Sequence, residues 1–366
     1  MSETQTFLKD KPYEFIPLLA PCKSIDYNEP SVREKCIYSG RLMLKMTIIS
    51  PLHIGGGLQD YDNNGNVVKK QMRRNGKIII PGSSLKGAVR SVAEAVSYSC
   101  AVKVPNQILQ SILPADNNKS CTSASNLCMT CYIFGMMSKS ESCRGRVRFG
   151  EFALESGNLI SEKIPALKSP FQNYPRPGKH DKFRTSEKCS YGNERLYYCR
   201  ACKSGNCEYC TKENYYQSIE MAGKERKMEF RGRKFYSTGK ELSLESGEET
   251  CYEMIAPGSV LKGEIVFQNL REEEGKLLAY ALDIGHFFCM KLGYGKPLGY
   301  GKVKIDLESA ESMGARYPSV AETDKKLVER WAQEYRTDQT DKIKSAVNEL
   351  ERIMGHEQRS NIANSY

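Results

Sequence analysis

The sequence lacks any apolar segment long enough to span a membrane, and its N-terminus lacks the basic-then-apolar pattern of a signal peptide. From these two features we expect a cytoplasmic chain without a membrane partner. A Walker loop is also missing, because no Gly-Lys-Ser/Thr sequence ends the glycine run at 55–57. Acidic residues are in the minority, with 44 of them against 54 lysines and arginines. The formal charge of +10 suits a polyanionic partner.

The 14 cysteines indicate metal binding rather than disulfides, because disulfides are rare in a cytoplasmic chain. Cys128 and Cys131 form a CxxC knuckle, which can present two thiolates to one tetrahedral ion. Cys121 and Cys143 are the remaining ligands in this prediction, and Cys100 competes with them. The alternative is a set of buried cysteines without a metal.

A second cysteine group lies in a polar, basic and tyrosine-rich region at 165–250. It consists of two CxxC pairs separated by four residues: Cys199, Cys202, Cys207 and Cys210. The loop is too short to bury a core, so we expect structural zinc to hold it. The interleaved cationic and aromatic residues around it, continued by Arg233, fit single-stranded nucleic acid. An ordinary tyrosine-rich surface is the alternative.

The segment 81–87 has the sequence Pro-Gly-Ser-Ser-Leu-Lys-Gly and follows a strand pattern at 78–80. Apolar residues then recur at helical spacing, which predicts a helix over 84–99 with Ser83 or Ser84 as its N-cap. Lys86 and Arg90 lie four residues apart on another face. A strand, a glycine turn, a helix N-terminus and two cations together predict an anion site. The alternative is a capped helix with solvated basic residues.

The segment 257–263 repeats this heptapeptide with one change, which indicates two related halves. A strand pattern at 263–268 follows it, so the two local structures need not match. A glycine-rich loop at 292–302 can pass close to a nucleic-acid backbone, with Gly295, Lys296, Gly299 and Lys302 as its candidate contacts. The final segment, 319–354, has the apolar spacing of helices that dock on the body or on a neighbouring subunit.

An alternating strand pattern at 42–49 leads into a glycine turn. His53, Gly55 and Gly56 lie in this turn, where backbone amides can approach phosphates, although a lone histidine also fits a structural role.

The polar loop at 58–77 contains Asp60 and Asp62 beside a run of lysines and arginines. Such a loop can hold a phosphodiester and its attacking group, and a solvated hairpin is the alternative. Later in the chain, the segment 146–154 predicts a strand with Arg146 and Arg148 on one face.

These motifs occur in an order that resembles the RAMP superfamily of CRISPR-associated proteins. The resemblance rests on the turn at 53–57, the segment 81–90, the CxxC-Tyr-Ile-Phe-Gly knuckle, the segment 145–149 and the glycine loop at 293–301. The segments 13–18 and 231–236 look like a type III-D-like branch.

The resemblance implies an α+β fold of ferredoxin-like, RRM-type units. The residue patterns described above add a zinc-binding insertion and a C-terminal helical segment to this fold. The expected division is an N-terminal half with the zinc knuckle, a basic insertion with the second cysteine group, a C-terminal half with the glycine loop, and a helical tail. Their bounds are 1–160, 161–250, 251–310 and 311–366.

The resemblance also implies that the chain binds guide RNA (crRNA) along its backbone in an antiviral type III effector complex. Target RNA and other effector subunits are then its partners, and Lys86 and Arg90 look like backbone contacts. Members that cut target RNA have an aspartate at a position that falls near Asn66 here, and an amide cannot act as a base. Asp60 and Asp62 are the candidates for cleavage, with a divalent ion such as magnesium on the phosphate.

Three functions therefore stay open. The first is a guide-binding subunit that also cleaves target RNA, and the second is a scaffold or cap subunit without catalysis. The third is a zinc-stabilised DNA-binding or nucleotide-binding protein outside CRISPR systems.

Overall fold

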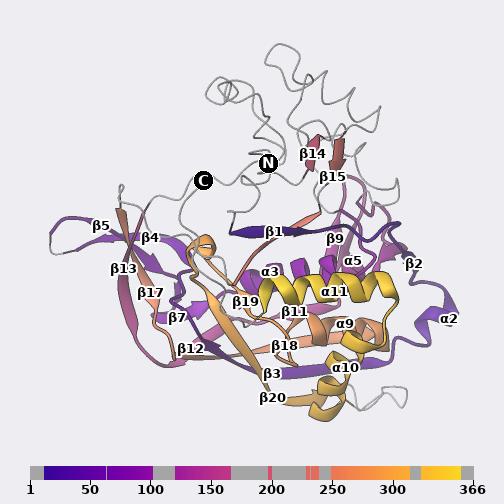
Figure 1. The fold of residues 1–366 in the computed structure, drawn as a ribbon. Coiled ribbons are helices and arrows are strands. Elements are labelled where there is room, and N and C mark those ends of the chain that lie inside the picture. The colour runs from indigo at the N-terminus through magenta and orange to yellow at the C-terminus, as the bar shows by residue number, and fades with distance from the viewer. Residues whose placement is uncertain are drawn as a thin grey trace.

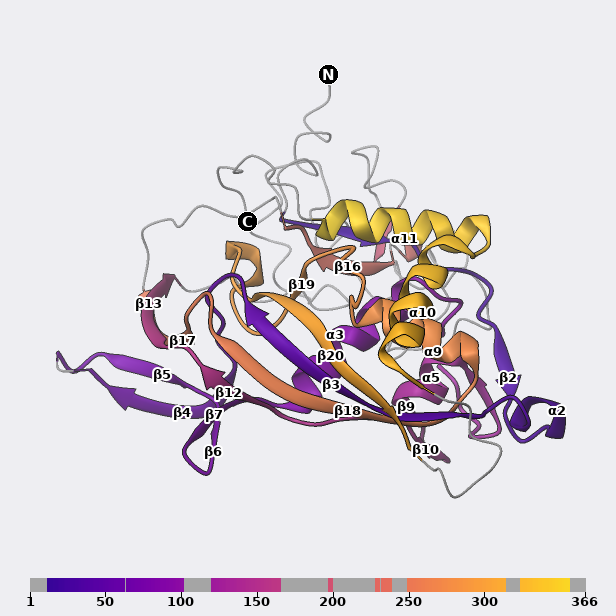
Figure 2. The same ribbon diagram turned by 90° about the horizontal axis from the view of Figure 1, so that it is seen from below.

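The computed structural model describes residues 12–62, 64–101, 120–165, 197–199, 228–230, 232–238, 249–313 and 323–355. Within these ranges the chain forms a large antiparallel sheet, a smaller sheet at one end of it, and helices that cover one face of the large sheet (Figures 1 and 2). None of the helices in these ranges is long and apolar enough to cross a membrane. The arrangement is the α+β class that the sequence predicts.

The large sheet has eight strands, in the order β19-β20-β3-β18-β12-β7-β6, with β11 pairing to β18 beside β12. Their bounds are Met290–Lys291 (β19), Lys302–Ser312 (β20), Tyr38–Ile48 (β3), Val260–Leu270 (β18), Phe152–Ser156 (β12), Lys77–Ile80 (β7), Arg73–Arg74 (β6) and Val147–Phe149 (β11). Most of β3 alternates between buried and half-buried residues, because one face of the strand packs on the core. Since β3 pairs with β18, a single sheet joins strands from both predicted halves.

The helices on the buried face are α3 (Gly82–Ala95), α5 (Met129–Phe134), α9 (Glu272–Ala281), α10 (Lys325–Thr337) and α11 (Asp341–Met354). In α10 the buried Trp331 packs so closely on Gly275 of α9 that an added Cβ there would lie 2.7 Å from the ring. The apolar side of α11, which includes Val347 and Leu350, is also buried. The C-terminal helices therefore dock on the body of this chain.

The smaller sheet has the order β13-β17-β5-β4, with bounds Leu159–Pro165 (β13), Glu249–Ile255 (β17), Val67–Gln71 (β5) and Gly55–Tyr61 (β4). The polar loop expected at 58–77 is thus largely a β4–β5 hairpin, as the solvated-hairpin alternative predicts. The 3-10 turn η3 (Lys296–Leu298) belongs to the glycine-rich loop. Tyr294 and Tyr300 of this loop pack on a small core formed by this sheet.

The remaining strands form short pairs, β1 (Tyr13–Ile16) with β16 (Arg233–Tyr236), β2 (Ser24–Asp26) with β8 (Asn126–Cys128), β9 (Gly135–Met137) with β10 (Ser142–Arg144), and β14 (Tyr197–Cys199) with β15 (Met228–Phe230). A single-turn helix, α2 (Pro30–Arg33), follows β2. The pairing of β1 with β16 and the burial of Ile16 show that the N-terminal segment is extended and packs on the body.

Two local predictions are wrong. The N-cap of α3 is Pro81 rather than Ser83 or Ser84, and no side chain caps this helix. The strand expected over 146–154 is two strands, β11 and β12, interrupted at Gly150. Phe149 pairs with Ile265 and Ala153 with Lys262, so the chain has one more residue than β18 between these pairs and bulges there.

Candidate functional site

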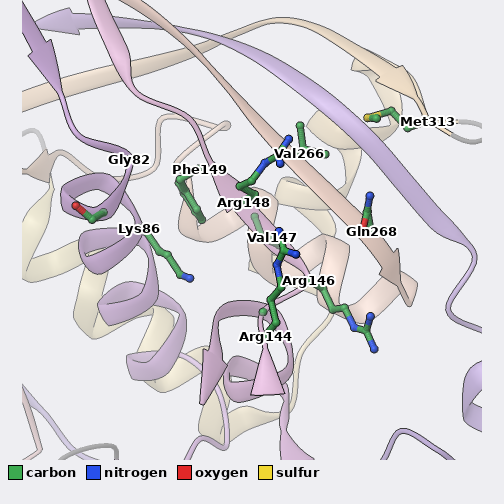
Figure 3. Close-up of a pocket in the computed structure, with 12 residues that line it drawn as sticks. Gly82, Lys86, Arg144, Arg146, Val147, Arg148, Phe149, Val266, Gln268 and Met313 are labelled. Atoms are coloured by element: carbon green, nitrogen blue, oxygen red, sulfur yellow. The ribbon is translucent and has the colours of Figure 1, made fainter. Parts of the chain in front are cut away.

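A groove of about 490 Å³ lies between the N-terminus of α3 and the segment 144–149 (Figure 3). Four of its lining residues are cationic: Lys86, Arg144, Arg146 and Arg148. The three arginines are exposed, and Lys86 extends from α3 toward them. The groove therefore brings together cations that are distant in the sequence.

Two glycines make this close approach possible. A Cβ at Gly82 would lie 2.2 Å from the carbonyl oxygen of Phe149, so only glycine lets the first turn of α3 approach the end of β11. A Cβ at Gly145 would lie 2.5 Å from the carbonyl carbon of Phe134, where the arginine segment packs on the end of α5. Both walls of the groove are thus fixed by backbone contacts.

The positive charge of the groove is not offset by carboxylates of the described residues. Across the ranges that the structure describes, no carboxylate pairs with any of the four cations. Burial lowers the pKa of Lys86 from its ordinary value, and the charge of Arg90 adds to this effect. Because the N-terminus of α3 also presents free amide groups, the site favours an anion with several negative oxygens.

Arg90 and Arg233, both predicted to contact RNA, instead bind Glu94 from two sides. Arg90 donates its Nε to Glu94 at 2.7 Å, and it donates Nη1 to the carbonyl of Gly135 at 2.9 Å. Arg233 also donates to the carbonyl of Cys100 at 2.9 Å. These guanidinium groups hold α3, β16 and the cysteine segments together.

His53 is buried, and its Nδ1 hydrogen-bonds the carbonyl of Glu253 at 2.8 Å. Burial lowers the pKa of the His53 ring below its ordinary value, which favours the neutral form. Gly55 and Gly56 begin β4, where an added Cβ on Gly56 would lie 2.5 Å from the Met72 sulfur. These contacts fit the structural alternative, and RNA contact by His53, Gly55 and Gly56 stays a prediction.

The glycine-rich loop folds against the smaller sheet. Tyr294 stacks on Tyr252 with ring centroids 4.8 Å apart. Gly295 and Gly299, which flank η3, have positive φ angles of 75° and 83°. Burial lowers the pKa of the half-buried Lys296, and Lys302 is the first residue of β20. RNA contact by these four residues stays a prediction.

Asp60 and Asp62 lie in the exposed β4–β5 hairpin. The Asp60 carboxylate accepts a hydrogen bond from the Tyr61 amide and pairs with Lys70 at 3.3 Å, and these contacts lower its pKa. Asp62 accepts bonds from the side chain and backbone of Asn66, which lower its pKa as well. Both are ionised carboxylates held by their own hairpin.

The basic run after these aspartates is engaged too. Lys69 donates to the Tyr252 hydroxyl at 3.2 Å, and Arg73 pairs with Glu253 at 2.6 Å. Arg74 pairs with Glu151 at 3.0 Å. This hairpin contrasts with the groove, whose cations have no carboxylate partner in the described residues.

Four cysteines gather behind the groove: Cys100, Cys121, Cys128 and Cys131. Their sulfur atoms all lie within 4.8 Å of one another, and Cys100 lies 3.5 Å from Cys131. Tetrahedral zinc with bonds of about 2.3 Å places its sulfur ligands about 3.8 Å apart, so the geometry fits this ion. The Cys128 amide donates to the Cys121 sulfur, and Arg90 lies 3.8 Å from the Cys131 sulfur, which offsets thiolate charge.

The structure gives the fourth position of this cluster to Cys100 rather than to Cys143. Cys100 follows α3, which places it opposite the knuckle, whereas Cys143 lies in β10 and its thiol donates to the carbonyl of Arg144. In the second predicted set, Cys199 ends β14, and Cys202, Cys207 and Cys210 lie outside the described residues. That second zinc site stays a prediction.

A family comparison matches residues 45–304 to the RAMP superfamily, which is more than two thirds of the chain. The chain belongs to the RAMP superfamily. Members of this superfamily work with RNA and with other CRISPR subunits, so a RAMP chain has a CRISPR-associated, RNA-binding role. Membership removes the alternative outside CRISPR systems. A comparison with curated proteins gave no match.

Sequence reasoning missed Arg144 and ranked Cys100 below Cys143. A signal for Arg144 was present, because arginines recur at every second position over 144, 146 and 148. No such signal existed for Cys100, since its distance from the knuckle in the sequence says nothing about their proximity in space.

Proposed function

We propose that this RAMP protein is a guide-binding subunit of a type III CRISPR effector complex, and that its groove grips the phosphate backbone of the guide RNA. One observation carries the proposal: Lys86, Arg144, Arg146 and Arg148 meet beside the α3 N-terminus without a carboxylate partner in the described residues. The type III assignment, and the III-D-like branch within it, rest on the order of the sequence motifs.

The chemistry of the groove suits a backbone more than a base. Arginine offers two parallel donors to a phosphate, and Lys86 supplies a compact charge. Each contact releases counterions from the RNA, which makes binding dependent on salt and independent of sequence. Pairing between guide and target then supplies the sequence specificity.

The decisive experiment compares Lys86→Ala with Lys262→Ala. Lys262 occupies the matching position of the second heptapeptide, but it is paired with Glu155 at 3.3 Å and with Glu308 at 3.2 Å. We expect Lys86→Ala to weaken binding to RNAs of unrelated sequence and to lower the slope of log K against log salt by about one. We expect Lys262→Ala to leave both unchanged.

The measurement is a fluorescence-anisotropy titration at several salt concentrations. Equal losses for the two variants, or a loss that depends on base sequence, contradict the proposal. Sequencing of RNA that copurifies with the chain and its partner subunits then tests whether the bound RNA is a guide.

Our proposal includes a structural zinc ion held by Cys100, Cys121, Cys128 and Cys131. The ion would fix the segments that carry Arg90, Arg144 and Arg146, with no chemical step of its own. We expect Cys100→Ser to lower the zinc content by one ion per chain and Cys143→Ser to leave it unchanged, as measured by elemental analysis. The reverse result would restore Cys143 as the ligand.

Cleavage is not part of this proposal, because Asp60 and Asp62 are engaged within the hairpin and Asn66 occupies the position of the family aspartate. The scaffold function therefore takes precedence. Guide-loaded complexes with complementary RNA and magnesium test this choice. Cutting by the wild type that is lost in Asp60→Ala or Asp62→Ala would establish the enzyme instead.

A further inference from the structure

Among the four groove cations, the described residues give an aromatic partner to Arg146 alone. Its guanidinium lies over the Tyr132 ring, 5.2 Å from the ring centroid. Tyr27 stacks on Tyr132 with centroids 3.6 Å apart and planes 2° from parallel. Because Tyr27 covers one face of Tyr132, the guanidinium lies at the other face. Arg271 lies over Tyr27, 5.5 Å from its centroid.

The two rings of this stack are held in place at their hydroxyl groups. Tyr132 donates to the carbonyl of Asn269 at 2.7 Å, and Tyr27 donates to the buried carboxylate of Glu274 at 2.8 Å. Both rings are buried, with 3% and 7% of their surfaces exposed. The surface against which Arg146 lies is therefore rigid.

We propose that Tyr132 is a positioning residue that holds the Arg146 guanidinium ready for a phosphate. A guanidinium stacked on a ring keeps its N–H donors in its own plane, where they remain free to bind oxygen atoms. The stack also restricts an exposed side chain before RNA arrives, so less rotamer freedom is lost on binding. This inference rests on the proposed function of the groove.

Arg148 provides the matched control, because it lines the same groove and the described residues give it no ring. We compare Arg146→Lys with Arg148→Lys, since lysine keeps the charge and loses the planar group. We expect Arg146→Lys to weaken RNA binding about two- to fivefold more than Arg148→Lys, because only at position 146 does the change remove a planar group that the ring holds in place before binding. Both substitutions lie on the surface, so folding is preserved.

Variants of Tyr132 test the ring directly. Tyr132→Phe keeps the ring and loses only the hydroxyl, so we expect wild-type affinity. Tyr132→Leu removes the ring and leaves the charge of Arg146, so we expect a smaller loss than in Arg146→Ala, and no further loss when Tyr132→Leu is added to Arg146→Ala. NMR relaxation of the Arg146 Nε–H group should show order in the wild type and in Tyr132→Phe, and motion in Tyr132→Leu. If Tyr132→Leu does not fold, the comparison of Arg146→Lys with Arg148→Lys, together with Tyr132→Phe, tests the role of the ring.

The outcomes separate this inference from the proposed function. Unchanged RNA binding and salt dependence in both Arg146→Ala and Lys86→Ala would overturn the groove itself, and this inference with it. A loss in Arg146→Ala together with equal losses in Arg146→Lys and Arg148→Lys would overturn only the role of Tyr132. Loss of affinity in Tyr132→Phe would assign the effect to the hydroxyl and would also overturn it.

Discussion

Two segments of this chain, 81–87 and 257–263, share six of seven residues and adopt different structures. The first begins α3 at Gly82, and the second begins β18 at Val260. Their differing position is Ser84 in the first and Val260 in the second. A β-branched residue favours a strand. The residues that follow add to this difference, with Ala88 directly after the first copy and the β-branched Ile265 and Val266 soon after the second.

The first glycines of the two copies, Gly82 and Gly258, have different structural roles. Gly82 lets α3 touch the backbone of Phe149, whereas Gly258 turns the chain with a positive φ of 81° and has open space where a Cβ would lie. The lysines differ in the same way, because Lys86 reaches the groove and Lys262 is paired with two glutamates. A shared heptapeptide thus does not fix one local structure, and its surroundings decide what its glycines and its lysine contact.

The largest expected effect is the difference in stability between alanine substitutions at the first glycines of the two copies, Gly82 and Gly258. Gly82→Ala places a Cβ 2.2 Å from a backbone oxygen that cannot move cheaply, so we expect a loss of about 3 kcal/mol in the free energy of unfolding. Gly258→Ala meets only the cost of a left-handed conformation, about 1 kcal/mol. Urea denaturation of both variants measures the difference. Equal losses would show that α3 does not depend on this contact.

Alanine substitutions at the last glycines of the two copies, Gly87 and Gly263, should change the free energy of unfolding in opposite directions. Gly263→Ala drives a Cβ to 2.5 Å from the ring of the fully buried Phe152, and we expect a loss of about 2 kcal/mol. Gly87→Ala has open space in an exposed part of a helix, and we expect a gain of about 0.5–1 kcal/mol. The same urea titrations test both, and a stabilised Gly263→Ala would contradict the packing described for β18.

The smallest expected effect concerns protonation of the two lysines. Burial lowers the pKa of Lys86, whereas Glu308 and Glu155 raise that of Lys262, both from an ordinary value of 10.5. As pH rises, Lys86 should lose its proton before an ordinary lysine does, and Lys262 after it. NMR titration of the lysine side chains measures the order. RNA affinity should fall in the same alkaline range, and the Lys86→Ala variant should lack this component.

The fold was predictable where a pattern is local. Alternation of apolar residues predicted β3, and helical spacing predicted α3 and the C-terminal helices. The smaller sheet was missed, because β13 and β17 are separated by the long segment predicted to be an insertion, and β5 pairs with β17 in parallel from a distant part of the chain. Pairing between remote strands leaves no periodic signal in either one.

The candidate site was likewise predictable only in part, because residue types are visible in the sequence and their tertiary partners are not. Lys86, Arg146 and Arg148 were named from their residue types, and the structure gathers them in one groove. Arg90 and His53 were named for the same reason, and the structure gives them partners within the chain, Glu94 for the half-buried Arg90 and the Glu253 carbonyl for the buried His53. Residue type shows that a group can bind a phosphate, but only its neighbours show whether it is already bound.

The sequence by itself determined the family, the class of fold, the excess of positive charge and the CxxC knuckle, because each depends on composition or on short spacing. The tertiary structure alone decided that Cys100 completes the cysteine cluster and that Tyr132 lies beneath Arg146. It also decided which cations remain without a carboxylate partner in the described residues. The physical reason is that ion pairs, ring stacking and thiol clusters act over a few ångströms in space, across separations in the chain that no local pattern records.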